Sequence, residues 1–172
     1  MATSFYDLSV ATYLQQVNGV CGFLQRGLDH ASENNLDLDE IVETRLFPDM
    51  LPFRFQVVAV VHHSAGALAG AKAGQSAPPG PSTADYAGLQ KLVSDARQSL
   101  EQLKPAEVNA LEGKDVMFSV RDIKLPFKAE GFLMSFSLPN LHFHATTAYD
   151  ILRQKGCPLG KRDYMGAMRM KL

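Results

Sequence analysis

Two long stretches of this sequence place apolar side chains at alternating steps of four and three residues, and this spacing constrains the fold most. One stretch runs from Val10 to Leu28 and the other from Tyr86 to Leu103. Such steps put side chains on one face of an α-helix, which must then pack against another element. A third stretch, from Phe53 to Ala73, is apolar on nearly all sides and is predicted to be a buried helix.

Capping and turn residues divide the chain into segments. Ser4 and Asp7 have the spacing of a capping box, while a run of prolines and glycines after Gln75 cannot continue a helix. The expected segments are helix 1 over residues 1–33, helix 2 over 52–74, a linker over 75–83, helix 3 over 83–104, a hairpin over 114–128, helix 4 over 129–155 and a C-terminal tail over 156–172.

The period of the apolar residues changes to two between Gly113 and Lys128, which predicts a β-hairpin. Pro126 cannot donate to a strand ladder, so its strand is predicted to lie at an edge. These segments together predict an all-α fold, an up-and-down four-helix bundle with a small β-hairpin insertion before the last long helix. At 172 residues the chain is expected to form a single domain, 1–172.

The charge balance and the cysteine count exclude several classes of protein. With 17 Lys and Arg against 18 Asp and Glu, the chain lacks the basic character of a nucleic-acid or anionic-membrane binder. No stretch approaches the roughly 18 apolar residues of a membrane span. Two cysteines suit neither a disulfide scaffold nor a four-cysteine zinc site, so a cytoplasmic location is expected.

Four of the five histidines fall in the two least polar helices: His62 and His63 in the second, His142 and His144 in the fourth. Polar groups in the interior of a bundle are where bundles build sites, so His63 and His144 are predicted to meet in a shared cavity. His142 and His144 are two residues apart and point to different sides of a regular helix. Because an i, i+4 histidine pair is missing, no metal and no cofactor are expected.

Other polar residues are candidates beside these histidines, and each also has a purely structural explanation. Asn140 could cap a helix that restarts after Pro139, and Arg45 could pair with Asp49 across a turn. Imidazole near its ordinary pKa exchanges protons efficiently around neutrality, which suits acid-base catalysis. The catalytic candidates are His63, His142, His144 and Tyr149, and the ligand-binding candidates are Arg45, Asp49, Gln56, His62 and Asn140.

Three separated motifs resemble a known family. They are RLFPDMLPF at 45–53, LPNLHFHATTAYDILR at 138–153 and PLGKRDY at 158–164, and the opening Tyr6-Asp7 fits as well. This pattern resembles domain-of-unknown-function family DUF1993, a branch of the DinB-like superfamily. The resemblance implies a four-helix bundle and a homodimer.

The resemblance implies less about activity. DinB-like proteins typically bind a divalent metal through one histidine on the second helix and an H-x-x-x-H pair on the fourth, and some are thiol-dependent transferases. Only His63 or His62, together with His144, match that pattern here. Ala148 stands where the last ligand would be.

Three functions therefore compete. The first is metal-independent binding of a small, largely apolar molecule, with proton transfer of the isomerase, dehydratase or cyclase type. The second is a metal-dependent thiol transferase of the DinB-like type, and the third is a non-catalytic dimeric interaction or stress-associated module. Hydrolase, kinase and redox motifs are absent from the sequence.

Overall fold

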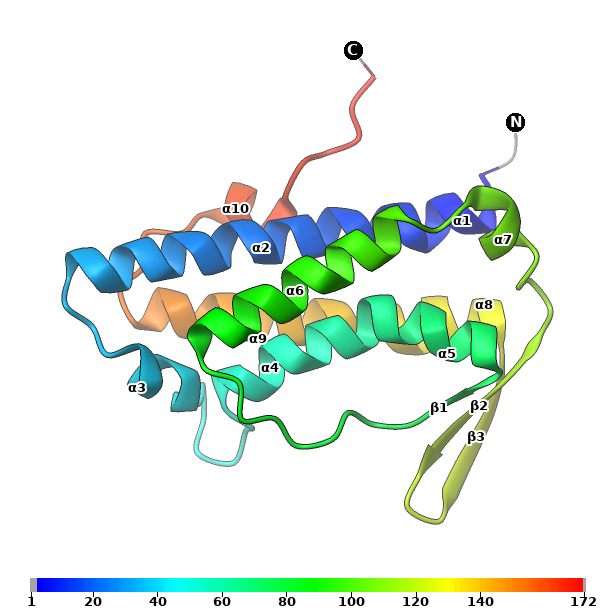
Figure 1. Ribbon diagram of the computed structural model, residues 1–172, viewed down its shortest axis with the longest axis horizontal. Coiled ribbons are helices and arrows are strands. Elements are labelled where there is room, and N and C mark those ends of the chain that lie inside the picture. The colour runs from blue at the N-terminus through cyan, green and yellow to red at the C-terminus, as the bar shows by residue number, and fades with distance from the viewer. Residues whose placement is uncertain (1–2, 172) are drawn as a thin grey trace.

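The structure, a computed structural model, describes residues 3–171 and is dominated by four long helices that lie side by side (Figure 1). Helix α2 contacts both α6 and α9, and α4 contacts the same two helices. Their apolar faces therefore enclose one common core. The four helices are α2 (Val10–Glu33), α4 (Phe53–Val61), α6 (Tyr86–Glu101) and α9 (Leu138–Gln154).

Side-chain caps begin several helices. The Ser4 hydroxyl accepts a hydrogen bond from the Asp7 backbone N–H and the Asp7 carboxylate accepts one from Ser4, so the predicted capping box is present at α1 (Phe5–Leu8). The prediction of one helix over 1–33 is wrong at Ser9, where the backbone bends between α1 and α2. At α6 the cap is Asp85, which accepts a hydrogen bond from the Gly88 N–H at 2.7 Å.

The second and fourth predicted helices both contain a π-helical turn. In the second, η1 (His62–Gly66) joins α4 to α5 (Ala67–Ala73). In the fourth, η2 (Phe132–Ser137) joins α8 (Ala129–Gly131) to α9. A π turn adds one residue to the regular helical turn and rotates the side chains that follow, and such turns are frequent at functional sites. Pro139 does not interrupt the fourth helix: it follows the π turn η2 directly, and Ser137 before it still has helical dihedrals, with φ −71° and ψ −42°.

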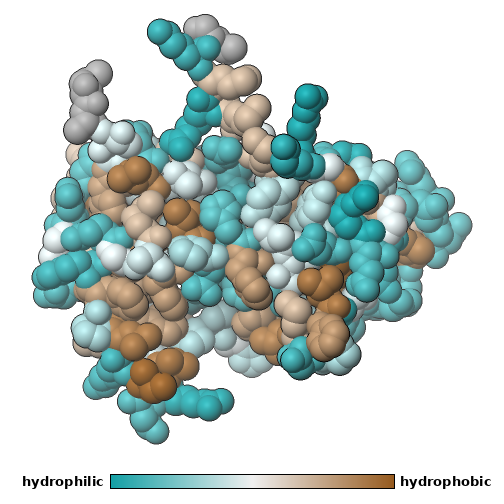
Figure 2. Space-filling view, turned by 180° about the vertical axis from the view of Figure 1, so that it is seen from behind, coloured by the Kyte–Doolittle hydropathy of each residue, from teal (hydrophilic) through white to brown (hydrophobic). Residues whose placement is uncertain are grey.

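A three-stranded sheet lies at one end of the helices (Figure 1). Its strands are β1 (Gln75–Ser76), β2 (Asp115–Val120) and β3 (Ile123–Lys128). Strand β2 pairs antiparallel with β3 and parallel with β1, so Pro126 lies on an edge strand. The hairpin extends away from the helices, and Figure 2 shows apolar surface over it, where Ile123 is 58% exposed.

The predicted linker 75–83 is wrong at its first two residues, because these form β1. Gly74 has a φ of 71°, which turns the chain at the end of α5, and its carbonyl accepts a hydrogen bond from the Met117 N–H at 2.9 Å. The sequence shows no strand period there, since two residues are too few to display one. From residue 77 onward the chain is extended and runs past α4 toward α6 (Figure 1).

Shorter helices complete the chain. Asp37 caps α3 with its side chain, whereas α4 begins after Pro52 without a side-chain cap. In the part of the chain that the structure describes, no helix has the length and apolar character needed to cross a membrane. The remaining helices are α3 (Leu38–Glu43), α7 (Pro105–Asn109) and, inside the predicted tail 156–172, α10 (Lys161–Met165).

Three of the long helices are in tight contact at Gly27 on α2. A methyl group at this position would collide with the Tyr86 hydroxyl of α6 and press against Leu152 of α9. The Tyr86 hydroxyl is held in place, because it donates a hydrogen bond to the Leu24 carbonyl at 2.8 Å. Gly27 is therefore required for this packing. Gly22, on the same helix, has open space around it.

We expect the variant Gly27→Ala to lower the free energy of unfolding by about 1–3 kcal/mol, because an extra methyl overfills a tight contact. Gly22→Ala is the matched control and should raise it by up to about 1 kcal/mol, since alanine favours a helix over glycine. Urea unfolding followed by circular dichroism measures both. Equal effects of the two variants would contradict this packing.

Candidate functional site

The rings of His63 and His144 meet between the second and fourth helical segments, while the shared cavity expected from the sequence stays a prediction. His63 is in η1 and is buried, while His144 is on α9 and is partly buried. Their rings are nearly parallel, with an interplanar angle of 9° and 5.7 Å between ring centroids. This pairing follows from the contacts that α9 makes with both α4 and η1.

Gln56 determines which nitrogen of His144 carries the proton. The Gln56 amide nitrogen donates to the Leu51 carbonyl at 2.7 Å, which leaves its oxygen facing His144. That oxygen is 2.8 Å from His144 Nδ1. An amide oxygen can only accept, so neutral His144 must hold its proton on Nδ1. The other nitrogen, Nε2, then carries the free lone pair.

Both imidazoles are neutral at physiological pH. The pKa of His63 is lowered to about 3, mainly by burial, with smaller contributions from the nearby His62 and His144. Burial also lowers the pKa of His144 to about 4, with a smaller contribution from His62. Removing a cation from water disfavours the charged form, and two cations this close would repel each other.

Aromatic side chains surround the pair. Phe136 of η2 meets the His63 ring edge-on at 5.6 Å, and Phe55 of α4 meets the His144 ring edge-on at 5.7 Å. Phe143 lies next to His144 along α9, at 5.2 Å, and is 55% exposed. The two histidines therefore lie among three phenylalanine rings, with Gln56 and His62 as polar neighbours.

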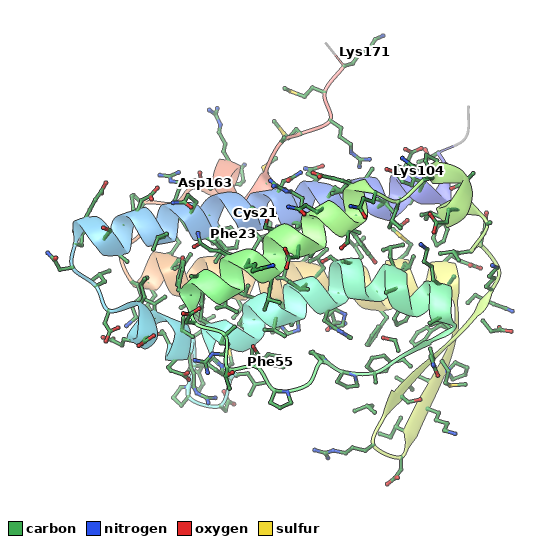
Figure 3. The ribbon with its side chains drawn as sticks, in the orientation of Figure 1. Cys21, Phe23, Phe55, Lys104, Asp163 and Lys171 are labelled. Carbon is green, nitrogen blue, oxygen red and sulfur yellow. The ribbon has the colours of Figure 1, made fainter. Side chains whose placement is uncertain are left out.

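Phe55 also lines a cavity of about 190 Å³ on its other side. Figure 3 shows Phe55 extending from α4 toward the extended segment that precedes α6. The cavity is mostly apolar, and it lies between the start of α4 and that segment. Its walls are Leu51, Pro52, Arg54, Phe55, Val58, Gly80, Pro81 and Ser82. One aromatic ring therefore contacts both His144 and this cavity.

The structure separates the four catalytic candidates into two groups. His142 is exposed, and its Nδ1 is 3.1 Å from the hydroxyl of Tyr164 in α10. Burial lowers the pKa of this histidine as well. Tyr149 packs edge-on against the same Tyr164 ring at 5.9 Å. His142 and Tyr149 thus belong to the contact between α9 and α10, whereas His63 and His144 lie between α9 and α4.

The ligand-binding candidates are also divided. Gln56 is hydrogen-bonded to His144, and the His62 ring meets the His63 ring edge-on, with 4.7 Å between the ring centroids. Burial lowers the pKa of His62. Arg45 and Asp49 are exposed in the loop before α4. The expected ion pair between them is wrong, since Arg45 donates instead to the Met50 carbonyl and no such pair occurs within residues 3–171.

Asn140 and Thr147 bond back to their own helix. Asn140 does not cap α9, because its amide nitrogen donates to the Phe136 carbonyl at 2.7 Å. Thr147 donates to the Phe143 carbonyl at 2.8 Å, a bond within the same helix. Neither side chain is directed by these bonds toward the histidine pair.

The donor set does not fit the metal that the DinB-like superfamily typically binds. Ala148, buried on α9, occupies the position of the last ligand and offers no donor atom. Across residues 3–171, no three His, Cys, Asp or Glu side chains come together in a way that could hold a metal ion. Three protein ligands are the usual minimum for a metal site.

Several members of this site carry no distinctive sequence signal. Phe55, Phe136 and Phe143 read as ordinary core aromatics, and Tyr164 lies in a segment predicted only as a tail. Its place in the PLGKRDY motif was the one available indication. His63 and Phe136 are positioned by π turns, and no residue pattern predicts a π turn from the sequence.

Comparisons with known proteins agree with this fold. Residues 5–165 match the family described as "Domain of unknown function (DUF1993)". The chain is similar to a solved structure of a DinB family member protein from Shewanella denitrificans, with a TM-score of 0.79 and 24% sequence identity over 97% of this chain and 94% of that one. Identity this low shows the fold alone. No match was found among curated proteins. The predicted helix-rich, DinB-like fold is confirmed.

The protonation of His144 is testable by NMR. At pH 7 we expect a proton on Nδ1 and none on Nε2, because the Gln56 oxygen must accept from Nδ1. Two-bond proton–nitrogen spectra of labelled protein measure this, with His144→Gln to assign the signals. In Gln56→Leu the acceptor is lost and the Nε2 tautomer should appear. An Nε2 proton in the unaltered protein would disprove the arrangement.

The low pKa values also predict how stability depends on pH. The usual histidine pKa is 6.5, whereas that of folded His63 is about 3 and that of His144 about 4. The unfolded chain therefore binds more protons than the folded protein below pH 6.5, and stability falls as the pH drops through that range. Each histidine contributes up to about 1.4 kcal/mol per pH unit. Above pH 7 these histidines are neutral in both the folded and the unfolded state, so they no longer make the stability depend on pH.

Urea unfolding between pH 7.5 and 4.5 measures that slope. His63→Phe keeps an aromatic ring but removes one titrating group, so it should flatten the dependence. Val60→Ala is the control, because it loses buried methyl groups without a change in titration and should lower stability equally at every pH. Equal slopes in the unaltered protein and His63→Phe would show that the pKa of His63 is the same in the folded and unfolded states, contradicting its lowered value.

Proposed function

Because the chain belongs to the DUF1993 family and shares its fold with a DinB family member, we propose that it is a small-molecule-binding helical-bundle protein. Its four long helices form an up-and-down bundle in a single domain, and the His63–His144 pair is the binding site. The ligand is a small, largely apolar molecule, on which the pair carries out metal-independent acid-base chemistry of the isomerase or lyase type.

The parallel stacking of His63 on His144 is the observation that carries this proposal. Two partly desolvated imidazoles are costly to place in a core and are seldom needed for packing alone. Gln56 holds His144 in one tautomer, so its Nε2 lone pair is available to a ligand. The aromatic rings of Phe55 and Phe136 favour an apolar ligand body, and the lone pair favours one polar hydrogen on it.

Because the pKa values of the two histidines are low, the ligand has to bind before His144 can act as a base. A neutral imidazole with a pKa of about 4 is a weak base in the free protein. A bound molecule on which negative charge develops raises the pKa of the imidazole beside it. His144 Nε2 can then take a proton from a carbon next to a carbonyl group. The C–H electron pair moves into the enolate, and return of the proton to another carbon completes an isomerisation.

Small ketones test this function. We expect cyclohexanone and 3-cyclohexenone to shift the side-chain NMR signals of His63 and His144, and the protein to speed exchange of the hydrogens next to the carbonyl in D₂O. His144→Gln should slow that exchange about a hundredfold, the usual contribution of a general base. His142→Ala is the matched control on the same helix and should keep the full rate.

Melting temperatures of these variants separate a functional site from a structural one. A binding pair should tolerate His144→Gln with only a modest loss of stability, while a purely structural pair should lose a few kcal/mol through unsatisfied neighbours. A stable His144→Gln variant with unchanged exchange and unchanged ketone binding would rule out this site.

A further inference from the structure

A second cavity, of about 200 Å³, lies between α2 and α6, which are not the helices that carry the histidine pair. Its lining residues recur at one-turn spacing on each helix, so one face of α2 meets one face of α6. Figure 3 shows Cys21 on α2 beside α6. The lining consists of Cys21, Leu24 and Gln25 from α2 and Gln90, Ser94 and Arg97 from α6.

Two of these polar side chains already have partners. The Gln90 amide nitrogen donates to the Gln25 oxygen at 3.2 Å. The Gln25 amide nitrogen in turn donates to the Asp29 carboxylate at 2.8 Å. These bonds tie the two glutamines into one wall of the cavity, and they leave Arg97 as the cationic group of the lining.

Arg97 has an unmet hydrogen-bonding need. Its Nε is buried, and no hydrogen-bond acceptor within residues 3–171 reaches it. The Glu101 carboxylate forms an ion pair with this nitrogen at 3.8 Å, a distance too long for a hydrogen bond. A guanidinium keeps its charge at any physiological pH and offers its donors in a planar fork that matches a carboxylate.

We propose that this cavity binds a small monocarboxylate, with its carboxylate on Arg97 and its short carbon chain over Leu24. A cavity of about 150 Å³ accommodates a benzene-sized molecule, so this one admits an acid of only a few carbons. Glu101 beside Arg97 disfavours a doubly charged anion such as phosphate. The site is independent of the histidine pair and of the chemistry proposed there.

Cys21 makes the site measurable, because its thiol lines the same cavity. In the test reaction the thiol loses its proton to solvent and the sulfur attacks the methylene carbon of an iodo reagent. A C–S bond forms and iodide leaves. Iodoacetate carries a carboxylate, whereas iodoacetamide has the same reactive carbon without the charge. Burial raises the pKa of Cys21 and Arg97 partly offsets this, but the ratio of the two rates cancels any change in thiolate fraction.

We expect the iodoacetate-to-iodoacetamide rate ratio at Cys21 to be at least about tenfold higher in the unaltered protein than in Arg97→Gln, as loss of a charge-assisted pair implies. Arg97→Lys should keep part of the preference, and Glu101→Gln should increase it. Cys157 is the internal control, since it is buried elsewhere, near the Arg26 carbonyl. Peptide mass spectrometry separates the two cysteines.

Protection experiments on the unaltered protein provide a test that needs no variant. Butyrate should slow the reaction of Cys21 with iodoacetamide, while the uncharged butyramide and inorganic phosphate should not. Equal rate ratios in the unaltered protein and a folded Arg97→Gln would overturn the proposal. If that variant does not fold, equal protection by butyrate and butyramide would overturn it, and stronger protection by phosphate would overturn the assignment to a carboxylate.

Discussion

The hydrogen bond between His144 Nδ1 and the Gln56 oxygen is the interaction on which the candidate site depends. A buried imidazole without a partner is costly, and the α4–α9 contact holds two imidazoles in apolar surroundings. Gln56 satisfies one nitrogen of His144 and is itself held by the Leu51 carbonyl. This chain of bonds ties the loop before α4 to a residue of α9. It also leaves one lone pair available, and that is the chemical basis of the proposed function.

The two π turns explain how an otherwise regular set of helices accommodates this pair. Each turn shifts the helical register and leaves backbone carbonyls poorly paired. Nearby hydroxyls meet that need: Ser64 donates to the Val60 carbonyl and buried Tyr13 donates to the Leu133 carbonyl, both at 2.7 Å. Burial raises the pKa of Tyr13, so its hydroxyl remains a donor. The π turns are thus supported by side chains from outside the turn as well as within it.

The two proposed sites differ in the charge that they suit. His63 and His144 are neutral and enclosed by aromatic rings, which favours an uncharged ligand. The α2–α6 cavity contains the guanidinium of Arg97, whose Nε is ion-paired with Glu101 but has no hydrogen-bond acceptor within residues 3–171, and this favours an anion. Separate helix interfaces of one core provide these environments, because each interface brings together different side chains.

The sequence by itself determined the helices, the edge position of Pro126, the location of the histidines in the second and fourth helical segments and the absence of a donor at Ala148. These follow from local periodicity and from residue identity, which do not depend on distant partners. Only the tertiary structure decided the π turns, strand β1, the tautomer of His144 and the placing of His142 with Tyr164 rather than with the pair. Each of these depends on contacts between residues far apart in the chain. A π turn, a strand or one histidine tautomer is stable only when another element supplies its hydrogen-bond or packing partner.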